Sequence, residues 1–114
     1  MYKLCRIDIG KGERNYKIIW KKLVELSDKL RQIHKIYRII IFGSYVRNDL
    51  NEGSDTDLII VGEFKERFHK RIAEILDLTD LPIEPMCYTK DEFKKMVVTD
   101  NRFVVDALKE GVEI

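Results

Sequence analysis

Cysteine and long apolar runs are scarce in this chain, and each scarcity excludes a class of protein. Only two of the 114 residues are cysteines, Cys5 and Cys87, and they form neither a disulfide framework nor a metal-binding spacing. The longest apolar runs, at 39–42 and 58–61, are too short to cross a bilayer. The first residues also lack the apolar segment of a secretory signal. We therefore expect a cytoplasmic protein with reduced thiols and no membrane association.

The chain carries little net charge, but its charges are unevenly distributed. The formal net charge is +1. Residues 1–40 hold 11 Lys and Arg against 4 Asp and Glu, whereas the rest of the chain is acidic. A basic segment of this kind attracts nucleic acid, but more often it is the solvated face of a helix. The composition therefore leaves nucleic-acid binding open without favouring it.

The apolar pattern predicts alternating helices and strands. Between Glu13 and about His34, apolar residues recur at steps of three and four, which is typical of an amphipathic helix. The unbroken apolar runs within 36–42 and 55–61 predict strands that are buried on both faces. Further expected elements are strands at 1–9, 82–88 and 112–114 and helices at 64–76, from residue 90, and at 101–109. With no repeat or linker, this alternation predicts one α/β or α+β domain over residues 1–114.

The residues best suited to chemistry are two carboxylates at the start of the second buried strand. Side chains alternate along a strand, so Asp55 and Asp57 are expected on the same face. Two like charges on an apolar strand are unfavourable unless a cation neutralises them. Mg²⁺ commonly binds one or two carboxylates and completes its shell with water and substrate phosphates. The pattern therefore predicts a metal–phosphate site.

A glycine-serine turn ends the first buried strand and fits the same site. Gly43 allows the backbone to turn sharply and to approach a ligand closely. Backbone N–H groups at the start of the helical turn that follows can hold phosphate oxygens. The Ser44 hydroxyl can donate another hydrogen bond, and the guanidinium of Arg47 matches phosphate geometry. Gly43, Ser44 and Arg47 are therefore the candidate phosphate-binding residues.

Together these motifs resemble a known enzyme signature. Gly43-Ser44-Tyr45-Val46-Arg47 followed by Ser54-Asp55-Thr56-Asp57-Leu58 resembles the signature of the DNA polymerase beta-like nucleotidyltransferase superfamily. The short length resembles the minimal nucleotidyltransferases, the MNT family, often encoded beside a HEPN-domain protein. The resemblance implies a palm fold, a small mixed sheet with helices packed against it. It also implies a third carboxylate, for which Glu84 is the best match, although a surface glutamate on an edge strand is the alternative reading. Tyr45 and Tyr88 flank the site, where aromatic packing is a commoner role than base stacking.

The resemblance also implies an activity and a partner. The implied reaction moves a nucleoside monophosphate, with ATP as donor, onto a hydroxyl, and uses two Mg²⁺ ions held by Asp55, Asp57 and Glu84. The implied acceptor is a HEPN toxin ribonuclease, so that this chain is an antitoxin that adds AMP to its partner. One alternative is a non-catalytic antitoxin that neutralises its partner by binding alone. Another is a nucleic-acid-binding subunit that uses the basic first helix, and homo-oligomerisation is left open.

Overall fold

A computed structural model describes residues 11–47 and 56–114 of the chain. The strand expected at 1–9 and the polar segment after Arg47 lie outside these residues. No helix in the described ranges is long and apolar enough to span a membrane. In chain order the elements are α1 (Lys11–Ile33), β1 (Ile36–Phe42), α2 (Ser44–Arg47), β2 (Thr56–Gly62), α3 (Phe68–Leu76), β3 (Ile83–Tyr88), α4 (Lys90–Val98), α5 (Arg102–Glu110) and β4 (Val112–Glu113).

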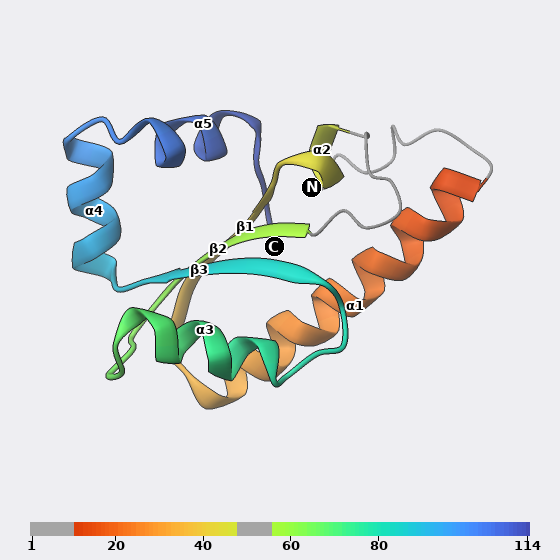
Figure 1. Ribbon diagram of the computed structural model, residues 1–114, viewed down its shortest axis with the longest axis horizontal. Coiled ribbons are helices and arrows are strands. Elements are labelled where there is room, and N and C mark those ends of the chain that lie inside the picture. Colours follow the sequence, from red (N-terminus) through yellow and green to blue (C-terminus); the bar gives the residue numbers. More distant parts are fainter. Residues whose placement is uncertain (1–10, 48–55) are drawn as a thin grey trace.

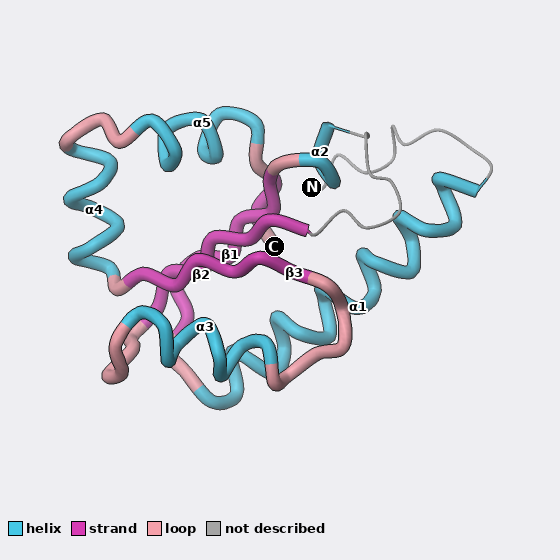
Figure 2. Tube along the Cα trace, in the orientation of Figure 1, coloured by secondary structure: helices cyan, strands magenta, loops and turns pink. Residues whose placement is uncertain are grey.

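The strands form one small mixed sheet in the order β3-β2-β1-β4 (Figure 2). β2 is antiparallel to β1 and parallel to β3, and β4 pairs antiparallel with the end of β1. This arrangement confirms the predicted mixed sheet with helices packed against it. Because β1 runs opposite to its neighbour, the end of β1 and the beginnings of β2 and β3 meet at the same end of the sheet. Among the predicted site residues that the structure describes, Gly43, Asp57 and Glu84 lie at that end.

Helices cover both faces of the sheet. Figure 1 shows α1 and α3 on one side and α4 and α5 on the other. Alternate residues of β1 enter different cores: Ile39 and Ile41 pack with the α1 and α3 residues, whereas Ile40 and Phe42 pack with the α4 and α5 residues. This alternation confirms the prediction that the unbroken apolar strands are buried on both faces.

The third helix is shorter than the sequence pattern predicts. Residues 64–76 were expected to be helical, but α3 begins at Phe68, with Arg67 in an extended N-cap conformation. Phe64 is instead buried while still outside the helix, and its ring lies 5.5 Å from the Arg71 guanidinium carbon. The apolar periodicity thus extends to Phe64 because its side chain packs in the core, although the backbone at Phe64 is not helical. In contrast, α4 begins after Thr89 as predicted, with a capping box between Thr89 and Glu92.

A buried arginine joins α3 to the end of β3 and to α4. Arg71 donates to the carbonyl oxygens of Glu66 (2.7 Å) and Cys87 (3.2 Å). It also pairs with the Glu92 carboxylate at 2.7 Å. The Arg71 hydrogen bond is the main reason that the pKa of Glu92 lies below its ordinary value. These contacts satisfy a buried cation and hold β3 in place beside β2.

Candidate functional site

Gly43 and Asp57 lie directly against each other at the end of β1. The antiparallel pairing of β1 with β2 sets Phe42 opposite Asp57. Gly43 follows with a φ of +79°, a conformation that favours glycine. A Cβ atom at this position would lie only 2.1 Å from Oδ2 of Asp57. Glycine is therefore required here both by its backbone conformation and by the carboxylate that occupies the space beside it.

Glu84 lies next to Asp57 on the neighbouring strand. The parallel register pairs Asp57 with Glu84, and residues at the same level of a sheet share a face. Ile59 and Tyr88, an even number of residues further along each strand, belong to the core on the α4–α5 side, so both carboxylates lie on that face. Glu84 is exposed. The non-local pairing thus brings together two of the three predicted carboxylates.

The other predicted site residues cannot be placed as side chains. Asp55 lies outside the described residues. Ser44 and Arg47 form the ends of the short helix α2, but their side chains are outside the description. Among the described residues, no three His, Cys, Asp or Glu side chains gather closely enough to hold a metal ion. Two of the three carboxylates that the sequence predicts for a metal site, Asp57 and Glu84, are described, and the third, Asp55, lies outside the described residues.

Sequence reasoning missed one carboxylate at this site. The backbone N–H of Gly43 donates to Oε1 of Glu110 at 3.2 Å, although the two residues are 67 positions apart in the chain. Glu110 is the last residue of α5. No motif marks it in the sequence, and it reaches Gly43 only because β4 pairs with β1. The Gly43 N–H is thus bound to Glu110 in this structure. The role of Gly43 at the site is to leave room for the Asp57 carboxylate.

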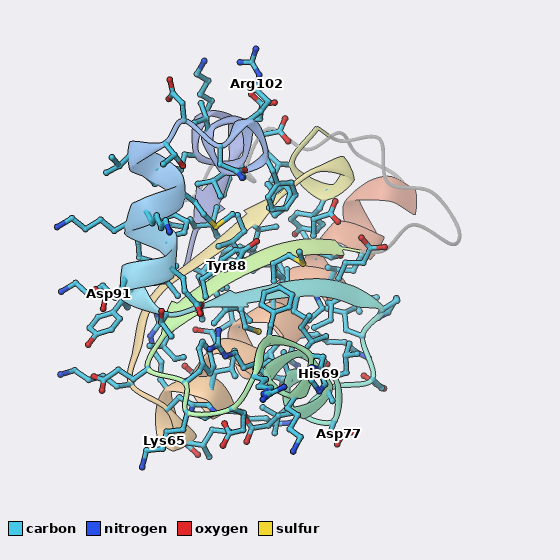
Figure 3. The ribbon with its side chains drawn as sticks, turned by 60° about the vertical axis from the view of Figure 1, so that its left-hand side comes forward. Lys65, His69, Asp77, Tyr88, Asp91 and Arg102 are labelled. Atoms are coloured by element: carbon cyan, nitrogen blue, oxygen red, sulfur yellow. The ribbon has the colours of Figure 1, made fainter. Side chains whose placement is uncertain are left out.

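Aromatic residues near the site divide into packed and exposed ones. Tyr45 is buried in the core on the α1 side. Tyr88 lies inside the molecule, near the rings of Phe68 and Phe93 (Figure 3), and burial is the main cause that raises its pKa. Both tyrosines therefore pack in the protein interior, as the commoner reading of the sequence predicts. Phe103 differs, because 42% of its surface is exposed while its ring contacts Phe42 edge-on at 5.4 Å.

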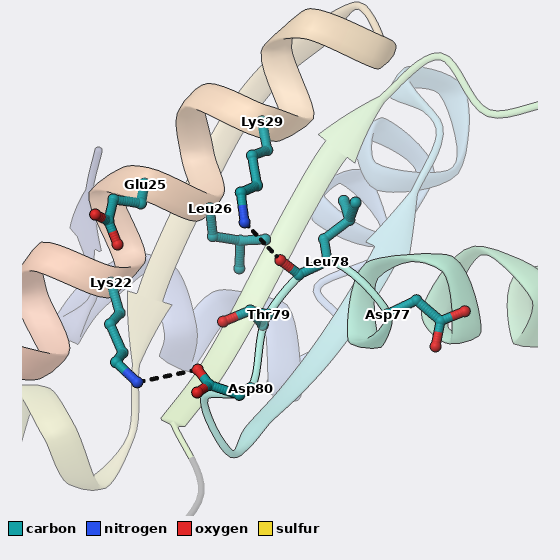
Figure 4. Close-up of a pocket in the computed structure, with 8 residues that line it drawn as sticks. All are labelled: Lys22, Glu25, Leu26, Lys29, Asp77, Leu78, Thr79 and Asp80. Carbon is teal, nitrogen blue, oxygen red and sulfur yellow. Dashed lines mark hydrogen bonds and ion pairs between the residues drawn. The ribbon is translucent and has the colours of Figure 1, made fainter.

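A polar cleft of about 420 Å³ lies on the opposite side of the sheet, between α1 and the segment that leads into β3 (Figure 4). Two lysines of α1 cross it: Lys22 pairs with Asp80 at 3.0 Å, and Lys29 donates to the Leu78 carbonyl at 3.0 Å. The hydrogen bond from Lys22 is the main cause that lowers the pKa of Asp80. These contacts tether the segment before β3 to α1. They therefore help to hold β3, the strand that carries Glu84, in place.

Comparison with known proteins identifies a family for this chain. The family model described as "Nucleotidyltransferase domain" matches residues 23–114, a range that includes Gly43, Asp57, Glu84 and Glu110. Among solved structures, the chain is similar to a candidate nucleotidyltransferase from Sulfolobus solfataricus, with a TM-score of 0.63 and 17% identity over 92% of this chain and 87% of that one. At this identity the likeness shows the fold alone. The comparison with curated proteins found no match.

The family match sets the general chemistry of this site. Members of the matched family use a nucleoside triphosphate and a divalent metal ion. Carboxylate oxygens such as those of Asp57 and Glu84 suit a hard divalent cation. The family match covers most of the described fold and all of the described site residues. The chain therefore belongs to the nucleotidyltransferase domain family, and its general reaction is nucleotidyl transfer.

Proposed function

We propose that this chain transfers AMP from ATP to a hydroxyl group of a partner protein. The observation that supports this proposal best is the joint placement of Gly43, Asp57 and Glu84. The Asp57 carboxylate occupies the space beside a glycine of positive φ, and Glu84, an exposed residue, stands in register with it on the edge strand β3. A carboxylate pair in this position suits the binding of a metal-complexed triphosphate better than it suits stability.

The proposed metal is Mg²⁺, as two ions, and the ligands would be Asp57, Glu84 and Asp55. Asp57 and Glu84 fit this role because both supply oxygen donors from one face and one level of the sheet. Bound Mg²⁺ would neutralise phosphate charge and lower the pKa of the acceptor hydroxyl. Glu84 is longer than the aspartate that many relatives are expected to carry, and it is an exposed residue on the edge strand β3.

The chain's own residues would bind and orient the triphosphate. Ser44 and Arg47 are proposed to bind its phosphate oxygens, because they begin and end the short helix that follows Gly43. Asp57, fixed against Gly43, would set the position of the reacting phosphate. The acceptor oxygen then bonds to the α-phosphorus as the bond to the bridging oxygen breaks, pyrophosphate leaves, and the hydroxyl proton passes to water. Holding the reactants in line is the principal contribution that the protein makes to such a transfer.

We further propose that the acceptor is a HEPN-type toxin ribonuclease encoded beside this chain, and that the chain is its antitoxin. The support is the short length and the signature that resembles the MNT family. In this fold the described helices all pack against the one sheet, so the described chain offers no separate acceptor-binding lobe. A partner protein that brings its own hydroxyl to the exposed Glu84 fits this arrangement.

The decisive experiment separates catalysis from binding. The chain is incubated with α-labelled ATP, Mg²⁺ and the product of the neighbouring gene, and labelled partner is expected. Asp57→Asn and Glu84→Gln should each lower the initial rate of label transfer by about 100-fold or more, since each removes a charged metal ligand. Asp28→Asn and Glu25→Gln, on exposed positions of α1, are the matched controls.

Three results would contradict parts of the proposal. Absence of label transfer by the wild-type chain would rule out the neighbouring protein as acceptor. If Asp57→Asn instead neutralised the partner as well as the wild type did, binding alone would account for the antitoxin effect. Calorimetry of ATP in the presence of Mg²⁺ tests the site without an acceptor, and equal affinities for wild type and Asp57→Asn would remove the metal site from the mechanism.

A further inference from the structure

Glu110 reaches the glycine turn because the end of the chain is tied to β1. β4 pairs with β1 through Ile41 and Val112, so the residue that precedes β4 by two positions arrives beside the end of β1. Gly111 makes this approach possible, since a Cβ there would lie 2.4 Å from the Ala107 carbonyl oxygen and 2.5 Å from Cγ2 of Ile40. The Gly111 N–H donates to the same carbonyl at 2.8 Å. The backbone path of this segment thus delivers the Glu110 carboxylate to Gly43.

The contact between Glu110 and Gly43 continues to Asp57. Glu110 accepts the Gly43 N–H through Oε1, a charge-assisted hydrogen bond. The Gly43 backbone in turn lies against the Asp57 carboxylate, which fills the position that a side chain would need. A rotation of the peptide between Phe42 and Gly43 would therefore move the surface on which the Asp57 carboxylate rests. The peptide is held on one side by β1 pairing and on the other by Glu110.

We propose that Glu110 is a positioning residue for nucleotidyl transfer, which acts by fixing the Gly43 peptide under Asp57. This inference rests on the proposed function, because Asp57 is taken as the metal ligand whose position matters. Glu110 acts as a hydrogen-bond acceptor in this role, not as a ligand of the metal. The role therefore requires an oxygen at Oε1 but no negative charge. That requirement separates it from a direct role in metal binding.

Glutamine and alanine at position 110 test the requirement. The full chain is labelled with ¹⁵N-glycine, which gives six glycine amides, and hydrogen exchange of the Gly43 amide is measured for wild type, Glu110→Gln and Glu110→Ala. Glu110→Ala should lower the protection of Gly43 by about 10- to 100-fold, since a hydrogen bond to a charged acceptor is lost. Glu110→Gln should lose clearly less protection than Glu110→Ala, because its amide oxygen can accept the same N–H, although without the added strength of a charged acceptor. Asp106→Ala, an exposed position in the same helix, is the control.

The kinetic arm uses the transfer of label from ATP with the same variants. Glu110→Ala should lower kcat by about tenfold or more while KM for ATP changes little, and Glu110→Gln should restore most of the rate. The amide of Gly62 in β2 reports global opening in the same spectra. If Glu110→Ala fails to fold, Glu110→Asp replaces it, since its shorter side chain should also lose the bond to Gly43.

The outcomes separate this inference from the proposed function. A wild-type chain that neither binds ATP nor transfers label contradicts the proposed function. An active wild-type chain whose Gly43 protection is unchanged by Glu110→Ala overturns the inference. It is equally overturned if Glu110→Gln loses as much activity as Glu110→Ala, because charge would then be essential, or if Glu110→Ala is faster than wild type, because the contact would then be inhibitory.

Discussion

Replacement of Gly43 by alanine is the sharpest perturbation that the structure offers. The new Cβ would lie 2.1 Å from Oδ2 and 3.0 Å from Cγ of Asp57. The carboxylate must therefore retreat by about 1 Å, a displacement that can cost about 100-fold in rate when it affects a reacting group. Alanine at a φ of +79° also carries a backbone penalty of about 1 kcal/mol. We expect Gly43→Ala to lose about 2 kcal/mol of stability in total, with the remainder due to the displaced carboxylate.

A double-mutant cycle isolates the contact with Asp57. In an Asp57→Ala background the two closest atoms are gone and only the Asp57 Cβ remains, at 3.3 Å, which small movements can accommodate. Gly43→Ala should then cost about 1 kcal/mol, the backbone penalty alone. Urea unfolding of the four proteins measures both costs. An equal cost of Gly43→Ala in the two backgrounds would show that the Asp57 carboxylate does not occupy this space.

Three further predictions concern residues that hold β3 and α4 in place. Arg71→Met should lose about 2 kcal/mol at neutral pH, because it leaves the carbonyl oxygens that Arg71 satisfies without their partner. The bond from Arg71 lowers the pKa of Glu92 below its ordinary value of 4.5, so this pair stabilises the fold above that pH and the contribution is lost as Glu92 protonates in acid. Urea midpoints measured from neutral to acidic pH should therefore fall less steeply for Arg71→Met than for wild type. Parallel curves for the two proteins would contradict the pairing. Thr89→Ala should cost about 1 kcal/mol through loss of the α4 cap, whereas Thr89→Ser should cost little; equal losses measured by thermal unfolding would argue against the cap. Burial is the main cause that raises the pKa of Cys87 to about 12. Iodoacetamide at about pH 8 should therefore leave this thiol unmodified in the folded chain and alkylate it in urea. Peptide mass spectrometry of the two samples measures the difference.

The type and order of the described elements could be predicted from local sequence. Strand β1 occupies Ile36–Phe42 as expected, and β2 extends one residue beyond its predicted end, to Gly62. Apolar side chains that enter both cores leave an unbroken hydrophobic run, and this signal depends only on neighbouring residues. The glycine of the site could be predicted for the same reason, because a sharp turn after a buried strand requires it locally. The start of α3 could not, since Phe64 packs against His34, just after α1, and against Arg71.

The carboxylates from distant parts of the chain were assembled only by the tertiary structure. Glu84 could be suggested by resemblance, but its position beside Asp57 depends on the parallel register of β2 and β3, and a slip of one residue would turn it to the opposite face. Glu110 carried no signal at all, because its contact with Gly43 results from the pairing of β4 with β1. Local sequence determines which residues form strands and which turn needs a glycine. Strand order and register, set by the packing of the whole chain, determine which carboxylates meet at that turn.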